Sequence, residues 1–226
     1  MNRYIDAHCH IFDANSLAGV GAICNATTIA DWPAVVSIIN QKQNIFGAVG
    51  VHPWHIADLP DDWQNTLRKL LSLHPDLMVG EAGLDKFYAD MPRQIDIFTA
   101  QLKIAYDSGR GICVHCVGAW DKLQQILKEY RTVLPRFLLM HCYVGSVQDI
   151  QKLSAKYNVY FSYGARNLHE HARLLATPLD RILAETDSDN PTDIINIVNH
   201  IADILNIAPD EMADIIYNNT IRMLNS

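Results

Sequence analysis

The chain has 226 residues, of which 49% are hydrophobic and 19% charged, the balance of an ordinary globular protein with one sizeable core. Its formal net charge of −7 excludes a protein that holds nucleic acid through a broad basic surface, but not an enzyme that engages phosphate through a metal. No apolar run approaches the roughly 20 residues of a membrane-spanning helix, and the first residues do not resemble a signal peptide, so we expect a cytoplasmic protein.

Apolar runs rich in β-forming residues alternate with amphipathic stretches along the chain. The apolar runs predict strands at 4–8, 21–25, 45–51, 77–81, 111–115, 137–141, 159–163 and 182–187. The amphipathic stretches predict helices at about 32–42, 61–74, 92–107, 119–130, 146–156, 167–176, 192–206 and 209–224. Strands and helices in this order predict a parallel sheet closed into a compact (β/α)8 TIM barrel, one domain over 1–226. A doubly wound open sheet is the alternative, but no glycine-rich phosphate loop follows the first strand.

Residue types at the ends of several predicted helices support these boundaries. Ser146 and Asp149 form a partial capping box, in which side chains bond the free backbone N–H groups of a helix start. Pro92 and Pro209 suit first helical positions, where no N–H partner is needed. Gly109 suits the turn that closes the helix over 92–107.

Two histidines stand at the end of the first predicted strand, where the sequence reads His8-Cys9-His10. Alternate side chains of a strand share a face, so both imidazoles project to one side and Cys9 to the other. Two converging imidazoles are half of a metal site. The rest of that site has to come from later parts of the chain.

Further candidate ligands stand at or just past the ends of later predicted strands: Glu81, His115, His141 and Asp187. In a barrel these ends share one face, which carries the active sites of this fold. Four imidazoles and two carboxylates have the ligand chemistry for one or two divalent metal ions. A glutamate can bridge two ions, and an aspartate can hold a water and accept its proton. One such residue alone is more often structural, but six at matching positions predict a metal site.

Other residues near the same face are weaker candidates. His52 follows the third predicted strand and is a candidate substrate contact, with a turn fixed by Pro53 as the equal alternative. Three cations are candidates for substrate phosphate, although a solvated surface charge is the commoner role: Lys86, Arg93 and Arg166. Aromatic residues that could stack on a base, or simply pack over the barrel, are Phe87, Tyr88 and Trp120, while Trp54 could form a wall.

The five cysteines do not form the pattern of a secreted disulfide framework. Cys113 and Cys116 form a C-x-x-C, which could indicate redox or zinc chemistry. They lie in an apolar strand pattern, where a spacing of three puts them on opposite faces. We therefore interpret them as buried thiols that pack as small hydrophobic groups.

The motifs IDAHCH, GVHP, VGEAGLD, LLMHCYVGS and LAETDS together resemble the TatD family of metal-dependent hydrolases, which are amidohydrolase-like TIM barrels. The resemblance extends from Tyr4 to the final YNNTIRML segment. It implies one metal held by His8, His10, Glu81 and Asp187, and a second held by Glu81, His115 and His141, with Glu81 bridging. Zinc, manganese, magnesium, iron and nickel all stay open.

Departures from the family pattern fall outside the implied ligands. The family often has an arginine two residues after the strand-five histidine, where this chain has Val117. Val144 and Ser188 also stand where other residues are common. The ligand set is therefore intact while the surroundings of the substrate differ.

The resemblance implies a divalent-metal-dependent hydrolase, a TatD-like deoxyribonuclease that cleaves phosphodiester bonds with a metal-activated water. Glu81 and Asp187 are its expected catalytic residues, and DNA ends or a small molecule its expected substrate. One alternative is an amidohydrolase-type enzyme acting on a small amide, lactone or ester. The other is a non-catalytic barrel used for binding. We expect a monomer with no membrane partner.

Overall fold

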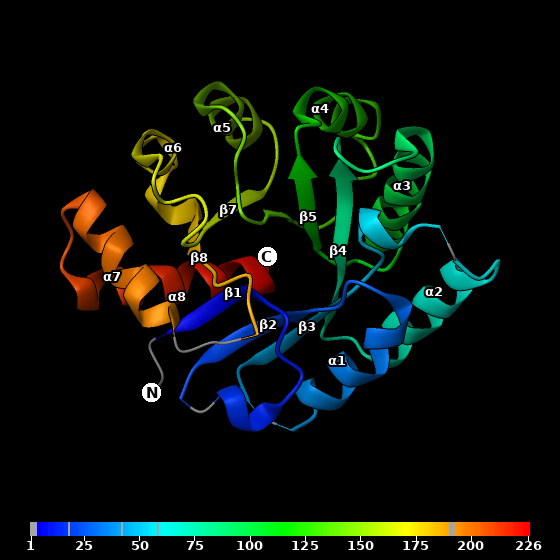
Figure 1. Cartoon of the computed structure of the whole chain (residues 1–226), viewed down its shortest axis with the longest axis horizontal. Helices are drawn as coiled ribbons and strands as arrows, with labels where there is room; N and C mark the ends of the chain where they lie inside the picture. The colour runs from blue at the N-terminus through cyan, green and yellow to red at the C-terminus, as the bar shows by residue number, and fades with distance from the viewer. Residues whose placement is uncertain (1–3, 18, 42, 58, 190–192) are drawn as a thin grey trace.

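Eight parallel strands run in the order β1 to β8, with helices around the outside (Figure 1). The computed structural model describes residues 4–17, 19–41, 43–57, 59–189 and 193–226. The strands are β1 (Ile5–Cys9), β2 (Gly21–Asn25), β3 (Ile45–Val49), β4 (Leu77–Asp85), β5 (Ile112–Val117), β6 (Leu138–Met140), β7 (Val159–Tyr163) and β8 (Ile182–Ala184). The predicted (β/α)8 barrel is confirmed.

The helices follow the strands in the predicted alternation. The α-helices are α1 (Trp32–Ile39), α2 (Trp63–Leu73), α3 (Met91–Asp107), α4 (Trp120–Glu129), α5 (Val147–Ser154), α6 (His171–Ala176), α7 (Ile194–Leu205) and α8 (Pro209–Asn225). Short 3-10 helices, which the sequence did not predict, are η1 (Ala14–Leu17), η2 (Ile29–Asp31), η3 (Pro53–His55) and η4 (Leu179–Arg181). None of the helices in the described part of the chain combines the length and apolar character that a membrane crossing requires.

Most element boundaries lie within a few residues of the prediction, but three differences matter. β4 continues to Asp85, four residues beyond its predicted end. β6 and β8 are shorter than predicted, so the segments 141 and 185–187 lie in the loops that follow them. The helix predicted over 167–176 starts only at His171, because the side chain of Asn167 accepts a hydrogen bond from the Gly164 N–H and fixes a turn. Residues 42 and 192, predicted as helix ends, lie outside the described residues.

Most of the predicted signals at the helix ends are present. Ser146 and Asp149 form a reciprocal capping box at the start of α5. Gly109 follows α3 at φ +62°, a left-handed conformation that glycine adopts without strain. Pro209 starts α8. These contacts stop and start the helices at the two ends of the barrel.

The first and last strands meet through the segment that follows β8. The Asp187 N–H donates to the carbonyl of His8 at 2.9 Å. The buried carboxylate of Asp6 accepts from the backbone and the hydroxyl of Thr186. This junction brings residues 8 and 187, far apart in the sequence, side by side.

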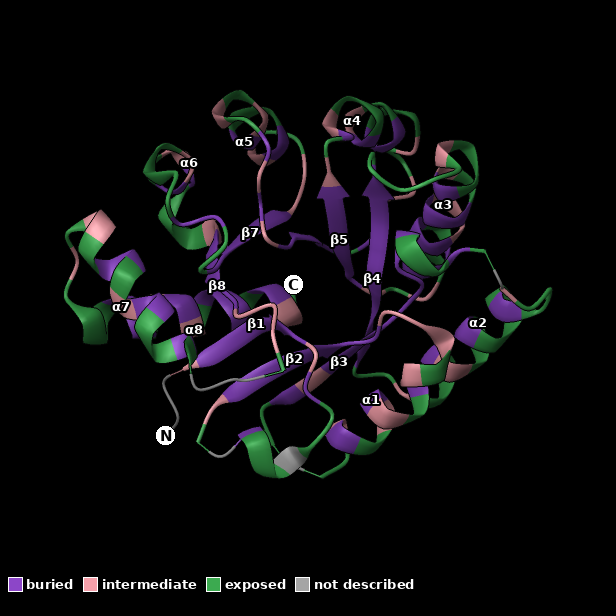
Figure 2. Cartoon of the chain, in the orientation of Figure 1, coloured by how far each residue is buried: buried purple, intermediate pink, exposed green. Residues whose placement is uncertain are grey.

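Buried apolar side chains form two large clusters, an inner layer inside the barrel and an outer layer between the sheet and the helices. Figure 2 shows the strands mostly buried and the helices partly exposed. All eight strands contribute to the inner layer, so it must fill the barrel interior: Ala7, Ile23, Ala48, Met78, Cys113, Phe137, Leu139, Tyr160 and Leu183. Cys116 belongs to the outer layer, which confirms that Cys113 and Cys116 point to opposite faces. All five cysteines are free.

Candidate metal centre

The six predicted ligands lie together at the carboxyl end of the barrel strands. His8, Glu81 and His115 lie within β1, β4 and β5. His10, His141 and Asp187 come directly after β1 or in the loops that follow β6 and β8. The carboxylate of Glu81, only 3% exposed, is at the centre of the group.

The backbone around Glu81 aims this side chain at the centre. The register between β4 and β5 shifts between Val79 and Ala82. Gly80 has φ +139°, a conformation that L side chains rarely adopt. A Cβ on Gly80 would also lie 2.7 Å from the Cβ of Cys113. Glycine is therefore required next to Glu81.

One carboxylate oxygen of Glu81 faces the residues that close the barrel. Its Oε2 lies 3.3 Å from Nε2 of His8 and 3.7 Å from Nε2 of His10. Oδ1 of Asp187 lies 3.3 Å from Nε2 of His10 and 3.7 Å from Nε2 of His8. Two imidazoles and two carboxylates therefore converge on one point.

The other oxygen of Glu81 faces a second group of imidazoles. Its Oε1 lies 2.8 Å from Nδ1 of His115, 2.9 Å from Nε2 of His141 and 3.2 Å from Nε2 of His52. His52, expected only as a substrate contact, is buried here among the candidate ligands. Its position after β3 is the same signal that marked the other residues.

The hydrogen bonding of these groups fits a bound cation. Nδ1 of His115 lies 3.1 Å from Nε2 of His52 and 3.2 Å from Nε2 of His141, so three ring nitrogens crowd one carboxylate oxygen. Nε2 of His8 is buried without a hydrogen bond, and so is Nε2 of His115. Buried polar atoms that lack partners are costly, and a divalent ion would use their lone pairs. The donor set, imidazole with carboxylate, suits transition metals better than calcium.

The carboxylates are held in the ionised form that binds metal. Burial by itself would raise the pKa of Glu81, but the imidazoles of His141 and His8 and hydrogen bonds from His115 hold it well below its usual value. Burial opposes ionisation of Asp187 too, yet a hydrogen bond from His10 and the nearby rings bring its pKa down to about 2. Both groups are anions at neutral pH.

Two of the imidazoles are held neutral. Burial lowers the pKa of His8, and the neighbouring ring of His141 lowers it further. Burial also lowers the pKa of His52. For His141 burial acts in the same direction, but the carboxylates of Glu81 and Glu185 outweigh it and raise the pKa. Neutral imidazole and ionised carboxylate are the forms that coordinate metal.

Two buried carboxylates behind the imidazoles were missed from the sequence. Oε1 of Glu185 lies 3.7 Å from Nδ1 of His141, and its other oxygen accepts from the hydroxyl of Ser162. Oδ2 of Asp85 lies 3.6 Å from Nε2 of His115. Carboxylates in such positions fix the orientation of a ligating ring. The available signal was an acidic residue within an otherwise apolar segment, VGEAGLD or LAETDS.

The weaker candidates are in different situations. Arg166, 72% exposed, places Nη1 2.8 Å from Oδ2 of Asp187 and so lies at the site. The guanidinium of Arg93 donates to the carbonyls of Ile56 and Ala57 at 3.0 and 3.1 Å, which ties down a loop. Lys86 is exposed on the loop after β4.

The fold and the site together define a class of protein: a TIM barrel with imidazoles and carboxylates gathered at its carboxyl rim, as in metal-dependent hydrolases. Within that class the chain belongs to the TatD family, because the model of the TatD related DNase family matches residues 5–225.

Individual relatives agree with this assignment. The chain is 26% identical to the uncharacterized metal-dependent hydrolase YjjV of Escherichia coli K12, over 99% of this chain and 98% of YjjV. The crystal structure of that TatD homolog superimposes with a TM-score of 0.90, covering 100% of this chain and 99% of the other. The 3'-5' ssDNA/RNA exonuclease TatD of Erwinia tasmaniensis is 28% identical, over 76% of this chain and 69% of its own length.

Proposed function

We propose that this protein is a two-metal phosphodiesterase that hydrolyses single-stranded DNA from its ends. The observation that carries the proposal is that the two carboxylate oxygens of Glu81 face different groups of imidazoles. Its Oε2 faces His8 and His10, and its Oε1 faces His115 and His141. A carboxylate placed between two groups of ligands is suited to bridge two ions, the arrangement used for in-line displacement at phosphorus. The similarity to a relative named as a single-strand exonuclease supports the choice of substrate.

The ligands would divide according to the same geometry. His8, His10 and Asp187 would hold one ion with Glu81, and His115 and His141 the other. Bound divalent ions supply charge neutralisation at the phosphoryl oxygens and lower the pKa of water from about 15.7 toward about 7. His52 would complete the second group.

The chain's own residues orient the reactants. Asp187 is an anion whose Oδ1 is fixed by His10, so it can accept a hydrogen bond and then the proton of the attacking water. Arg166 bonds the other oxygen of Asp187 and keeps further N–H donors exposed at the rim. A guanidinium in that position can bind a phosphate oxygen of the substrate.

The test begins with metal analysis of protein purified without chelator. Hydrolysis is then measured on single-stranded oligodeoxynucleotides and on a panel of cyclic amides and lactones, with Mg²⁺, Mn²⁺ or Zn²⁺. We expect bound metal, release of nucleotides from strand ends, loss of activity with a chelator and recovery when metal is restored. Turnover of the carbonyl substrates alone would replace the proposal with the amidohydrolase alternative. Absence of both bound metal and turnover would favour the other alternative, a non-catalytic barrel used for binding.

We also propose that the enzyme acts as a single-domain monomer over 1–226 in the cytoplasm. The candidate centre is built from one chain, and the five free cysteines suit a reducing compartment. One cooperative unfolding transition, a monomer mass by light scattering and recovery in the cytosolic fraction are the expected results. A second unfolding transition would contradict the single domain, and a larger mass would contradict the monomer. Recovery in another cell fraction would contradict the cytoplasmic location.

A further inference from the structure

Three large aromatic side chains are exposed at the same end of the barrel as the metal centre. Trp54 lies in η3, after β3, and is 49% exposed. Phe87 and Tyr88 lie in the loop after β4 and are 80% and 47% exposed. We call Trp54, Phe87 and Tyr88 the aromatic shelf. Clustered exposed rings are unfavourable in water, so they indicate a binding surface.

Two rings of the shelf are already stacked. The centroids of Trp54 and Tyr88 lie 5.1 Å apart with an angle of 17° between the ring planes. The indole N–H of Trp54 donates to Oδ2 of Asp85 at 2.7 Å, and its ring packs edge-on against His52 at 4.8 Å. Trp54 therefore has a fixed orientation before any ligand arrives.

The loop that carries the other two rings is also fixed. The side-chain amide of Gln94 donates to the carbonyls of Tyr88 and Ala89 at 3.2 and 3.1 Å. The Phe87 N–H donates to the carboxylate of Asp85 at 2.9 Å. The rings are thus kept in water by an ordered backbone, and little conformational entropy is lost when a flat ligand binds.

The shelf connects directly to the metal centre. The ring centroid of Trp54 lies 6.3 Å from that of His115. Asp85, which accepts the Trp54 indole N–H, also lies 3.6 Å from Nε2 of His115. A substrate whose phosphate is at the centre therefore has its neighbouring groups next to the shelf.

We propose that the aromatic shelf stacks an unpaired nucleobase of the substrate, a proposal that rests on the phosphodiesterase function above. The net charge of −7 leaves little general attraction for a polyanion, so affinity has to come from another source. Stacking on aromatic side chains supplies it for any base sequence. A paired base in a duplex has both faces covered, so the shelf selects single strands.

The other aromatic residue considered for stacking does not belong to the shelf. Trp120 is partly buried and packs against Tyr143, with the ring centroids 4.8 Å apart. It therefore serves packing over the barrel. The rings of the aromatic shelf, which are about half exposed or more, are the ones available for stacking on a ligand.

Tyr88 is the residue to change, because Trp54 also positions Asp85. Tyr88→Ala removes a stacking ring, and Tyr88→Phe keeps it. Tyr106→Ala is the matched control, since Tyr106 is 44% exposed near the end of α3, at the opposite end of the barrel. The probe is a fluorescent single-stranded phosphorothioate hexanucleotide, which resists hydrolysis, in Mg²⁺. A strand of abasic units with the same length is the second probe.

We expect Tyr88→Ala to weaken binding of the base-bearing strand about 5- to 100-fold, and to raise KM on an ordinary strand accordingly. Binding of the abasic strand stays unchanged, and Tyr88→Phe and Tyr106→Ala behave as the parent. Equal affinity of parent and Tyr88→Ala for the base-bearing strand overturns the shelf, and so does an equal loss on the abasic strand. The binding measurement needs no turnover, so it decides the shelf even where the parent protein fails to hydrolyse any phosphodiester.

Discussion

The carboxyl end of the barrel and the barrel interior below it differ in what their buried side chains are: polar groups at the carboxyl end and apolar groups below. At the carboxyl end, His8, His115 and His141 bury ring nitrogens that have no hydrogen-bond partner within the described residues. Below them the barrel interior is an apolar layer in which Leu139 and Tyr160 are almost completely buried. Unsatisfied polar groups cost stability and apolar contacts supply it, so the candidate metal centre lowers the stability of the fold and the apolar layer below it raises that stability.

Backbone conformation shows the same contrast. Left-handed residues away from the site include Asn44 and Asn206, at φ +65° and +54°, and asparagine tolerates this conformation. At the carboxyl end Cys142 and Asp187 have φ +42° and +49°. A cysteine there is strained, and such strain persists where the surrounding structure holds a functional group in place.

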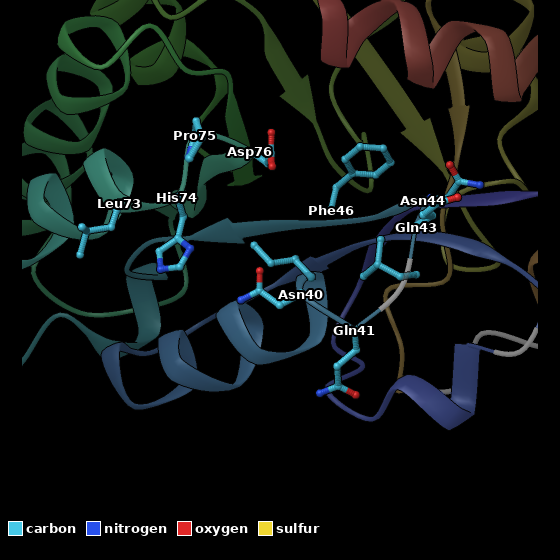
Figure 3. A pocket seen from close by; sticks show the side chains of 11 residues that line it. Asn40, Gln41, Gln43, Asn44, Phe46, Leu73, His74, Pro75 and Asp76 are labelled. Atoms are coloured by element: carbon cyan, nitrogen blue, oxygen red, sulfur yellow. The ribbon is translucent and has the colours of Figure 1, made fainter.

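A hollow of about 610 Å³ shows that size alone does not mark a site. It lies at the amino end, between the end of α1 and the loop before β4, and Figure 3 shows its side chains. Amides such as Asn40 and Gln41 line it together with Phe46 and His74. None of the described residues around it buries a side-chain polar atom without a hydrogen bond. Buried polar side chains that converge and lack hydrogen bonds therefore indicate the candidate metal centre better than the volume of a hollow does.

The largest expected effect comes from Glu81→Gln, which keeps the size of the side chain and removes the charge. We expect bound metal to fall and hydrolysis to drop about 1,000-fold or more, because bound ions contribute several kcal/mol to the transition state. Metal analysis and initial rates measure this, with the exposed Glu129→Gln on α4 as control. If the metal content and the hydrolysis rate were both unchanged, the carboxyl end would not be the metal centre and its contrast with the apolar interior would be lost.

Next is Leu139→Ala in the inner apolar layer. Leu139 is fully buried, so the cavity should lower the free energy of unfolding by about 3 kcal/mol. Urea unfolding measures this, and Leu73→Ala, at a side chain 64% exposed, should change little. The folded fraction of Leu139→Ala keeps its metal and its rate. Loss of metal from protein that is still folded would show that the two ends are not separable.

A smaller effect is expected for Glu185→Gln, behind His141. Removing the charge should weaken metal affinity or turnover about 10- to 100-fold, as for other carboxylates that orient a ligating ring. Competition with a chelator gives the affinity, and turnover at saturating metal separates the two quantities. Glu170→Gln, at a side chain 51% exposed, is the control. The positioning role fails if affinity and turnover both match the parent.

The smallest effect concerns Asp31, which lies beside the carboxyl end of the barrel and accepts hydrogen bonds from four neighbouring groups. Oδ2 of Asp31 accepts from the backbone and hydroxyl groups of Thr27 and Thr28. Burial raises its pKa, but these bonds outweigh burial and lower it. Asp31→Ala should cost about 1 kcal/mol at pH 7, with normal hydrolysis.

The pH dependence of that loss gives a sharper test. Because the pKa of Asp31 is lower in the folded state, its contribution is present above the unfolded value of about 3.9 and is lost as pH falls through the folded value. The difference in unfolding free energy between parent and Asp31→Ala should therefore shrink as the pH falls below the unfolded value. If the difference in unfolding free energy did not change with pH, the loss in Asp31→Ala would come from packing and not from the charge of the carboxylate.

Much of this protein could be predicted locally. Periodicity located eight strands with helices between them, because each pattern depends only on which face of its own element is buried. The same reasoning placed His8 and His10 on one face, and placed Glu81 and His115 at the correct end of the barrel. Strand ends were predicted less accurately, as β4, β6 and β8 show.

Tertiary structure alone decided how the candidate ligands are grouped. Which oxygen of Glu81 faces which imidazole depends on the register shift in β4 and on the closure of β1 onto the segment after β8. His52, Asp85 and Glu185 became recognisable only when the loops were placed in space. The pairing of Trp54 with Tyr88 likewise joins two loops. Sequence pattern determines the buried face of each segment, whereas contacts between distant segments are set by how the whole sheet closes.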